Sequence, residues 1–335
     1  MSEIIPIERG QEVTADLQAR FERINIAYKT VNNTPIETAI LVPKKLLAKS
    51  PDSITAVPVL VHFHGGGLRV GTNPEPFFLA DWVRDLAHQA PAIFLSPAYR
   101  LVPESRAVDA LSDVADFWTW LRDPAANPLN QLIFSRWPHL VPDMDRVAAI
   151  GESAGGFLAL QSALQFNRVA KLRAVIAQYP ACFTDLQVFN RRPEEPRPEF
   201  DRVVDEYVKN MKEGELRVSS PWPETLDFFI AVSMTGRSRE MFGDDPEGRL
   251  TLRYALEQAE EVPPPMWVVQ GDKDGIVPRE ATDEMVERIR RERPKAVVKY
   301  TVRPGDHGFD VLNTLQDDWV KEGVDFVKGE WLYWP

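Results

Sequence analysis

The chain has 335 residues, of which 44% are hydrophobic and 27% charged, a composition typical of a soluble globular protein. Its formal net charge of −11 argues against nucleic acid and anionic membrane surfaces as partners. The one cysteine, Cys182, excludes an internal disulfide and favours a reducing compartment.

The N-terminal residues 1–14 include several charged side chains and no apolar core segment, so we expect no signal peptide. No apolar run approaches the roughly 18 residues that a membrane-spanning helix needs. A cytoplasmic protein without a membrane span is therefore expected. The length suffices for one large α/β unit.

Runs rich in β-branched residues predict eight strands, and helix-period segments alternate with them from the third strand onward. Such alternation predicts a mostly parallel sheet with right-handed crossovers and flanking helices. The expected strands are 21–28, 36–42, 56–63, 92–97, 146–150, 172–178, 266–270 and 296–302. The expected helices are 76–89, 107–121, 157–166, 279–293 and 311–327. Segment 123–145, which contains proline and asparagine, is expected to be a long surface loop.

Between the sixth and seventh strands, residues 181–265 interrupt the alternation. This insertion opens with a charged, proline-rich stretch and continues with helix-like pieces at 202–211 and 226–234. Its position predicts a helical cap over the carboxyl ends of the strands, with 1–180 and 266–335 forming the core. The alternative is a pair of helices without a functional role.

The pentapeptide Gly151-Glu152-Ser153-Ala154-Gly155 lies between an apolar run and a helix-period segment. A nucleophile elbow needs this context, since its serine occupies a tight strand-to-helix turn and the glycines remove side chains that would clash. Taken alone, the pattern could be an ordinary turn capped by serine.

Earlier in the chain, the run His64-Gly65-Gly66-Gly67 follows another predicted strand. It could present backbone N–H groups to a developing oxyanion, or it could simply be a flexible loop. Both motifs in the right order, each at the end of a predicted strand, predict a serine hydrolase.

A serine nucleophile needs a base, and the base needs an orienting acid. In such folds the chain order is serine, acid, histidine, and His307 is the one histidine after Ser153. The acid is expected in loop 271–278, after the seventh strand. Asp274 is favoured over Asp272 because it precedes the x-x-V-P that leads into the next helix; Asp272 could stabilise the turn.

The other histidines have structural interpretations. His62 is expected in a strand, His88 in a helix and His139 in a loop, whereas His64 is expected to organise the glycine run. No metal-ligand spacing is recognisable. No cofactor is expected.

Together these residues resemble the hormone-sensitive-lipase-like branch of the α/β-hydrolase superfamily, also called α/β-hydrolase type 3. The resemblance covers most of residues 56–326 and is weakest in the insertion. It rests on His64–Gly67, Tyr99–Glu104, Asp145–Arg146, Gly151–Gly156, Asp274–Pro278 and Asp306–Phe309. It departs from the family where Glu152 stands in place of the usual aspartate.

The resemblance implies an eight-stranded, mostly parallel α/β-hydrolase sheet flanked by helices, with a helical cap. It implies that the amides of Gly66, Gly67 and Ala154 form an oxyanion hole. It further implies that residues 1–20 join the cap, and that Tyr99 and Arg100 support the site structurally.

We therefore expect a carboxylic ester hydrolase with a small, hydrophobic ester or acyl substrate. The oligomeric state is left open. One alternative is a pathway-specific thioesterase, lactonase, acyl-transfer or cyclising enzyme acting on a natural product, which would use the same residues. Another is a catalytically silent small-molecule receptor, similar to the plant gibberellin receptors. Retention of Ser153, Asp274 and His307 argues against that receptor.

Overall fold

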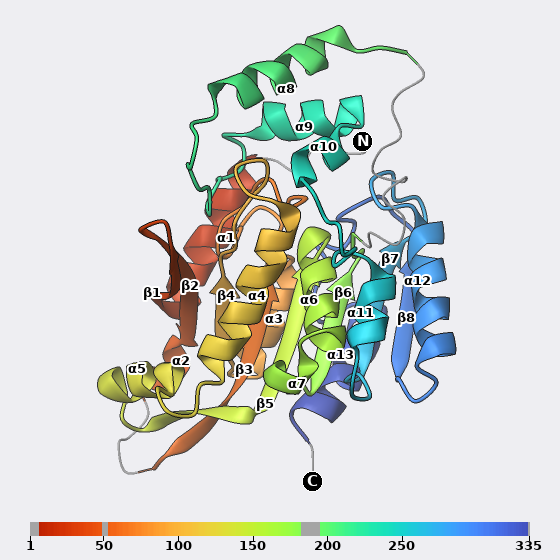
Figure 1. Cartoon of the computed structure of the whole chain (residues 1–335). Coiled ribbons are helices and arrows are strands. Elements are labelled where there is room, and N and C mark those ends of the chain that lie inside the picture. Colours follow the sequence, from red (N-terminus) through yellow and green to blue (C-terminus); the bar gives the residue numbers. More distant parts are fainter. Residues whose placement is uncertain (1–6, 49–52, 182–194, 334–335) are drawn as a thin grey trace.

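The computed structural model describes residues 7–48, 53–181 and 195–333, and is built around one eight-stranded sheet (Figure 1). The strand order is β1-β2-β4-β3-β5-β6-β7-β8. The strands are β1 (Phe21–Val31), β2 (Thr34–Pro43), β3 (Thr55–Phe63), β4 (Ile93–Pro97), β5 (Leu140–Glu152), β6 (Ala174–Gln178), β7 (Met266–Gly271) and β8 (Val298–Arg303).

Only β2 breaks the parallel arrangement within the described residues, because it runs antiparallel to both β1 and β4. The pairs from β4 to β8 are all parallel. Every residue of β4 and β6 is buried, as expected for strands covered on both faces. The predicted eight-stranded, mostly parallel sheet is confirmed.

Helices cover both faces of the sheet, so that alternate residues of a strand enter different cores. These helices are α1 (Ile7–Arg20), α2 (Lys44–Leu47), α3 (Asp81–Gln89), α4 (Ala107–Leu121), α5 (Pro128–Arg136), α6 (Ala154–Leu164), α7 (Asn167–Ala170), α12 (Arg279–Glu292) and α13 (Asp318–Trp331). Figure 1 shows α4 and α6 in front of the sheet and α3 and α13 behind it. Val59 and Val61 of β3 pack in the core beneath α4, α6 and α12, while Leu60 packs in the core beneath α3 and α13.

The expectation of a long surface loop at 123–145 is wrong. Residues 128–136 form α5, and β5 begins at Leu140. The early part of β5 pairs residues 140–143 with 55–58 of β3, and a register shift separates this ladder from the main one. This tertiary pairing outweighs the low strand propensity of Pro142 and Asp143.

Two predicted helices start later than expected. α3 begins at Asp81 and α13 at Asp318, and the segment before α13 accepts hydrogen bonds from the start of α3 instead of forming helical turns. The amide of Asp81 donates to the carbonyl of Val311, and the amide of Trp82 to that of Asn313.

Within the described part of the insertion, α8 (Pro198–Asn210), α9 (Leu226–Thr235) and α10 (Ser238–Phe242) lie beyond one end of the strands, whereas α11 (Leu252–Gln258) lies beside α6 (Figure 1). Backbone hydrogen bonds between Gly71 and Ser220 join the insertion to the loop after β3. The proposed boundaries 1–180, 181–265 and 266–335 stay a prediction, and Cys182 lies outside the described residues.

The described part of the N-terminal segment 1–20 is α1, which packs beside β1. The buried Arg9 guanidinium anchors it by donating to the carbonyls of Leu79 and Val311. Its participation in a cap stays a prediction. Across the described ranges, none of the helices is long and apolar enough to span a membrane.

Candidate active site

Ser153 lies at a sharp turn between β5 and α6, with φ of 55° and ψ of −117°. L-residues rarely adopt this conformation, so the surrounding structure must enforce it. The flanking glycines are sterically required: a Cβ on Gly155 would lie 1.9 Å from the carbonyl oxygen of Phe63, and one on Gly151 would lie 2.3 Å from the carbonyl oxygen of Gly155. The turn therefore has the geometry of a nucleophile elbow.

The structure brings together the three residues that the sequence nominated. His307 Nε2 lies 3.0 Å from Ser153 Oγ, and His307 Nδ1 lies 2.9 Å from Asp274 Oδ2. The three side chains lie close together because β5, β7 and β8 are parallel, and each residue follows the carboxyl end of one of these strands. The Asp274 side chain is fully buried, and that of His307 is 15% exposed.

The loop after β7 fixes Asp274 and separates it from Asp272. Asp274 Oδ1 accepts hydrogen bonds from the amides of Ile276 and Val277, at 2.9 and 2.7 Å. Its other oxygen also accepts from Gln270 Nε2 at 3.0 Å. Asp272 does not contact His307 through a hydrogen bond; it accepts from the amide of Gly305. The geometry agrees with the preference for Asp274.

The glycine run, residues 64–67, forms a turn beside the elbow and is called the glycine loop below. Gly66 and Gly67 have φ of 95° and 64°, and a Cβ on Gly66 would lie 2.1 Å from the carbonyl oxygen of Val70. Ala154 begins α6, whose first amides lack intrahelical acceptors. In the described ranges the amides of Gly66 and Gly67 donate to no protein acceptor, which leaves both available.

Glu152 makes a contact that the sequence reasoning missed. Its Oε1 accepts from the amide of Gly65 at 2.7 Å, and its Oε2 lies 2.8 Å from His62 Nε2. The carboxylate thus joins the elbow to the glycine loop and to β3. The substitution of glutamate for the family's aspartate was a visible signal, but its partners are 87 and 90 residues away in sequence.

His64 organises the glycine loop as the sequence predicted. Its ring stacks on Tyr99 with centroids 4.4 Å apart, and its Nδ1 lies 2.8 Å from the carbonyl oxygen of Gly65. Complete burial lowers the pKa of His64 to about 4, so the ring is neutral at neutral pH. The hydroxyl of Tyr99 donates to the His64 carbonyl at 2.7 Å.

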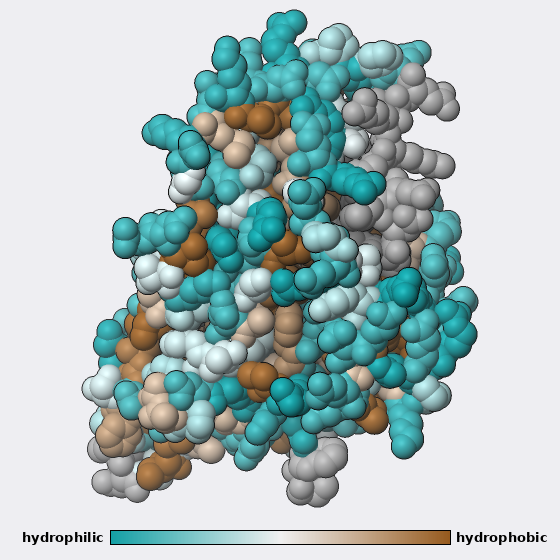
Figure 2. Space-filling view, in the orientation of Figure 1, coloured by the Kyte–Doolittle hydropathy of each residue, from teal (hydrophilic) through white to brown (hydrophobic). Residues whose placement is uncertain are grey.

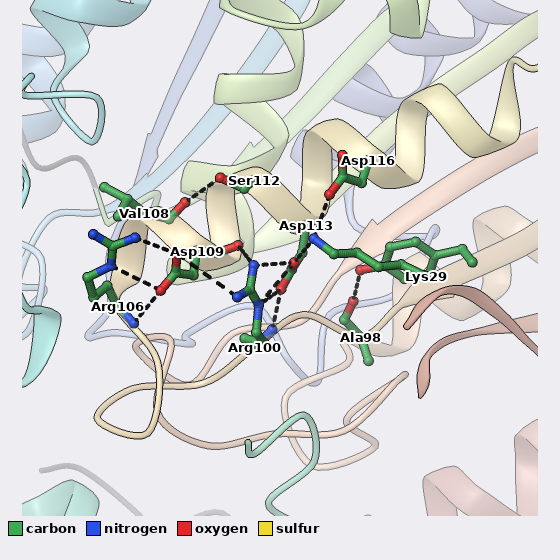
Figure 3. A network of polar contacts seen from close by, with 10 residues as sticks. Lys29, Ala98, Arg100, Arg106, Val108, Asp109, Ser112, Asp113 and Asp116 are labelled. Carbon is green, nitrogen blue, oxygen red and sulfur yellow. Dashed lines mark hydrogen bonds and ion pairs between the residues drawn. The ribbon is translucent and has the colours of Figure 1, made fainter. Parts of the chain in front are cut away.

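The residue after Tyr99 joins the site to α4 (Figure 3). Arg100 binds the buried Asp113 through Nε and Nη2, at 2.9 and 2.8 Å, and its amide donates to the same carboxylate. Lys29 Nζ lies 2.6 Å from Asp113 and also reaches Asp116. Tyr99 and Arg100 therefore have the structural contacts that the resemblance implied.

The loop that carries His307 is held by two aspartates. Partial burial disfavours the charge on Asp306, but hydrogen bonds from the amides of Gly275 and His307 hold its pKa below the usual value. Burial raises the pKa of Asp310, which accepts from Trp82 Nε1 at 3.0 Å and from Gln178 Nε2 at 2.7 Å.

An aromatic cluster, defined here as Phe77, Phe78, Trp222 and Phe229, lies beside the glycine loop. The Trp222 ring is 5.2 Å from the rings of Phe77 and Phe78 and 5.8 Å from that of Phe229. A Cβ on Gly67 would lie 3.3 Å from Phe229 Cε2. On the α1 side of the cluster, Phe77 and Trp222 line a cavity of about 440 Å³.

The remaining histidines have structural positions. His88 lies on α3, and His139 directly precedes β5 and approaches the carbonyl oxygen of Leu46 at 3.0 Å. Among the residues that the structure describes, no cluster of three or more His, Cys, Asp or Glu side chains could hold a metal ion.

A parallel sheet with a serine at a strand-to-helix turn, and with a histidine and an aspartate at neighbouring strand ends, defines the class of the α/β hydrolases. The family match extends over residues 60–310, and the chain belongs to the α/β hydrolase fold family. The resemblance stated from the motifs is thereby confirmed.

Curated relatives and a solved structure agree with this assignment. "Probable carboxylesterase M8" of Phoma sp. is 28% identical over 325 residues, covering 93% of this chain and 97% of the relative. "Probable carboxylesterase clz11" of Cochliobolus lunatus is 27% identical over 195 residues, covering 56% of this chain and 86% of the relative. The crystal structure of esterase LipW from Mycobacterium marinum has a TM-score of 0.59 at 19% identity, covering 98% of this chain and 88% of that one, a likeness of fold.

Proposed function

We propose that the protein is a carboxylic ester hydrolase that works by acyl transfer through Ser153, His307 and Asp274. The observation that carries the proposal is the pair of contacts at His307, 3.0 Å to Ser153 Oγ and 2.9 Å to Asp274 Oδ2. The similarity to a probable carboxylesterase over nearly the full length supports the same chemistry.

In the acylation step, His307 Nε2 takes the proton of Ser153 as Oγ forms a bond to the ester carbonyl carbon. The carbonyl oxygen becomes an oxyanion, which the amides of Gly66, Gly67 and Ala154 stabilise in this proposal. Asp274 holds the Nδ1–H tautomer and stabilises the imidazolium. When the bond to the alcohol oxygen breaks, His307 returns the proton to that oxygen, and the alcohol leaves.

In the second step, water attacks the acyl-enzyme while His307 Nε2 takes one of its protons. The bond between Ser153 Oγ and the acyl carbon breaks, Oγ recovers the proton, and the carboxylic acid is released. The original proton of Ser153 leaves with the alcohol and a proton from water replaces it, so Ser153 and His307 end in their starting protonation states. The steps use only groups of this chain, the ester and water.

The proposed substrate is a small-molecule ester with an apolar part, because the aromatic cluster lies directly beside Gly67. The acidic net charge supports the absence of nucleic acid from its partners. A reducing compartment such as the cytoplasm fits the single cysteine.

The test is hydrolysis of a p-nitrophenyl ester series, from acetate to decanoate, by the wild-type protein and by Ser153→Ala. We expect turnover in the wild type and loss of about 10⁴-fold or more in kcat for the variant, since the nucleophile is missing. Ser135→Ala, on the surface of α5, is the matched control and should retain full activity. Equal turnover by wild type and Ser153→Ala would refute the mechanism.

A further inference from the structure

Arg69 is a buried cation that follows the glycine loop by two residues. The residue is 5% exposed, and its guanidinium donates to two serine hydroxyls, Ser233 Oγ at 3.3 Å and Ser238 Oγ at 2.6 Å. Its Nε is buried without a hydrogen-bond partner among the described residues. No carboxylate within those residues forms an ion pair with it.

Two aromatic rings complete the surroundings. The guanidinium carbon lies 5.5 Å from the ring centroid of Phe229 and 5.8 Å from that of Phe242. Cation–π contacts and neutral hydroxyls offset only part of the cost of burying a charge. Burial lowers the pKa of Arg69 to about 10, so the side chain still carries its charge at neutral pH.

Two arginines of the insertion differ from Arg69 in this respect. Arg237, at the start of α10, lies 2.7 Å from Asp205 and 2.5 Å from Glu240. Arg217 lies 3.1 Å from Glu104. These arginines follow the common rule that a partly or fully buried charge is paired. Arg69 is the most buried of the three and has no acidic partner in the described structure.

The position of Arg69 connects it to the chemistry of the site. A Cβ on Gly67 would lie 3.6 Å from Arg69 Cζ, so the guanidinium packs against the loop expected to hold the oxyanion. A ligand bound at the glycine loop would therefore lie close to a positive charge that has no acidic partner among the described residues.

We propose that Arg69 binds a carboxylate carried by the ester substrate, an inference that rests on the proposed function. The substrate would then be a mono-anionic ester, with an apolar part against Phe229 and Trp222 and one carboxylate on Arg69. The proposal accounts for the lack of an acidic partner of Arg69 among the described residues, because the substrate would supply the carboxylate on binding. A charge-assisted hydrogen bond in an apolar site discriminates strongly against neutral analogues.

The experiment compares esters that differ only in charge. On the acyl side the pair is mono-p-nitrophenyl adipate and its methyl ester. On the alcohol side it is 3-carboxyphenyl butyrate and its methyl ester. In one of these pairs, we expect the wild type to favour the anionic member. Arg69→Met should lower kcat/KM for that ester by about thirtyfold or more, and for its neutral partner by less than about threefold.

Controls separate recognition from folding. Arg237→Met removes a paired arginine from the same region and should affect both members of each pair equally. Arg69→Lys keeps the charge and should retain part of the preference. In a Ser153→Ala background, monomethyl adipate should raise the unfolding temperature more than dimethyl adipate does, and Arg69→Met should abolish the difference.

The outcomes distinguish the two proposals. If the wild type hydrolyses the neutral esters but prefers neither anionic ester, the carboxylate proposal fails and the hydrolase proposal stands. If Arg69→Met lowers kcat equally for charged and neutral esters, Arg69 supports the oxyanion or the loop, and the carboxylate proposal is overturned. If no ester is hydrolysed, the hydrolase proposal fails, and the unfolding temperatures alone decide on Arg69.

Discussion

Single residues account for much of what the site can do, and Glu152 shows this most clearly. Its carboxylate accepts from the amide of Gly65, and it also approaches His62. Gly65 precedes the two glycines proposed to hold the oxyanion. Glu152 is therefore a positioning residue, since it acts through the backbone of the loop.

Replacement of Glu152 should consequently change kcat more than KM. Glu152→Ala removes the acceptor for the buried Gly65 amide, and we expect kcat to fall by about tenfold to a hundredfold because the oxyanion donors shift. Glu152→Gln retains one acceptor oxygen and should keep most of kcat. Steady-state kinetics on p-nitrophenyl butyrate gives kcat and KM for both variants. A Glu152→Ala protein with the wild-type kcat would contradict this role.

Many single residues of the candidate site could be predicted from the sequence. Ser153, Asp274 and His307 were accessible because the elbow, the acid loop and the histidine turn each follow a recognisable strand. The contacts of Glu152 and the burial of Arg69 were not, because they join segments far apart in the chain. No local pattern records such pairs.

At the scale of elements, the alternation of strands and helices could be predicted because central parallel strands such as β4 and β6 are fully buried and mostly apolar. The sequence-based predictions of strands and helices were wrong where tertiary contacts determine the local structure. The early part of β5 contains Pro142 and Asp143 and becomes a strand by pairing with β3. Val311 and Asn313, before α13, accept hydrogen bonds from the first two amides of α3, and α13 begins later than predicted.

The anchoring of α4 yields a stability prediction. Asp113 is fully buried and paired with Arg100 and Lys29 (Figure 3). Asp113→Ala removes the buried carboxylate that the two cations share and leaves Lys29 with the exposed Asp116 and Arg100 with Asp109 at 4.0 Å. We therefore expect a loss of about 3–5 kcal/mol in the free energy of unfolding. Asp116→Ala, on the same helix and 53% exposed, should cost less than about 1 kcal/mol. Urea denaturation measures the loss of stability in both variants. Equal losses would refute the larger role of Asp113 in anchoring α4.

At the scale of the whole molecule, the viewed surface is largely hydrophilic, with scattered hydrophobic residues (Figure 2). The acidic balance of the chain agrees with this surface. Several acidic groups are buried, and Glu75 is one of them: it is 2% exposed and accepts hydrogen bonds from Thr72 Oγ1 and the amide of Phe77. Burial raises its pKa to about 7.

The stability of the protein should depend on pH through Glu75. Its pKa is higher in the folded than in the unfolded chain, so folding takes up a proton between about pH 4.5 and 7. The contribution of protonated Glu75 to the free energy of unfolding is fully present below pH 4.5 and is lost as the pH rises to 7. The free energy of unfolding should fall over that range by an amount on the order of 3 kcal/mol from this group.

Urea denaturation at several pH values tests this dependence with two variants. Glu75→Gln should flatten the slope, whereas the exposed Glu287→Gln should leave it unchanged. If the free energy of unfolding of Glu75→Gln varied with pH as steeply as that of the wild type, groups other than Glu75 would cause the dependence.

The backbone bridge between Gly71 and Ser220 has a mechanical consequence. Each residue donates to the other, at 2.7 and 2.9 Å, and nearby the amide of Leu101 donates to the carbonyl of Arg217. Gly71 follows the glycine loop closely. A rotation of α8 and α9 that preserved these bonds would therefore turn about the Gly71–Ser220 bridge. The Gly71–Ser220 bridge would then couple motion of the insertion to strain in the proposed oxyanion site, together with the contacts of Arg69 with Ser233 and Ser238.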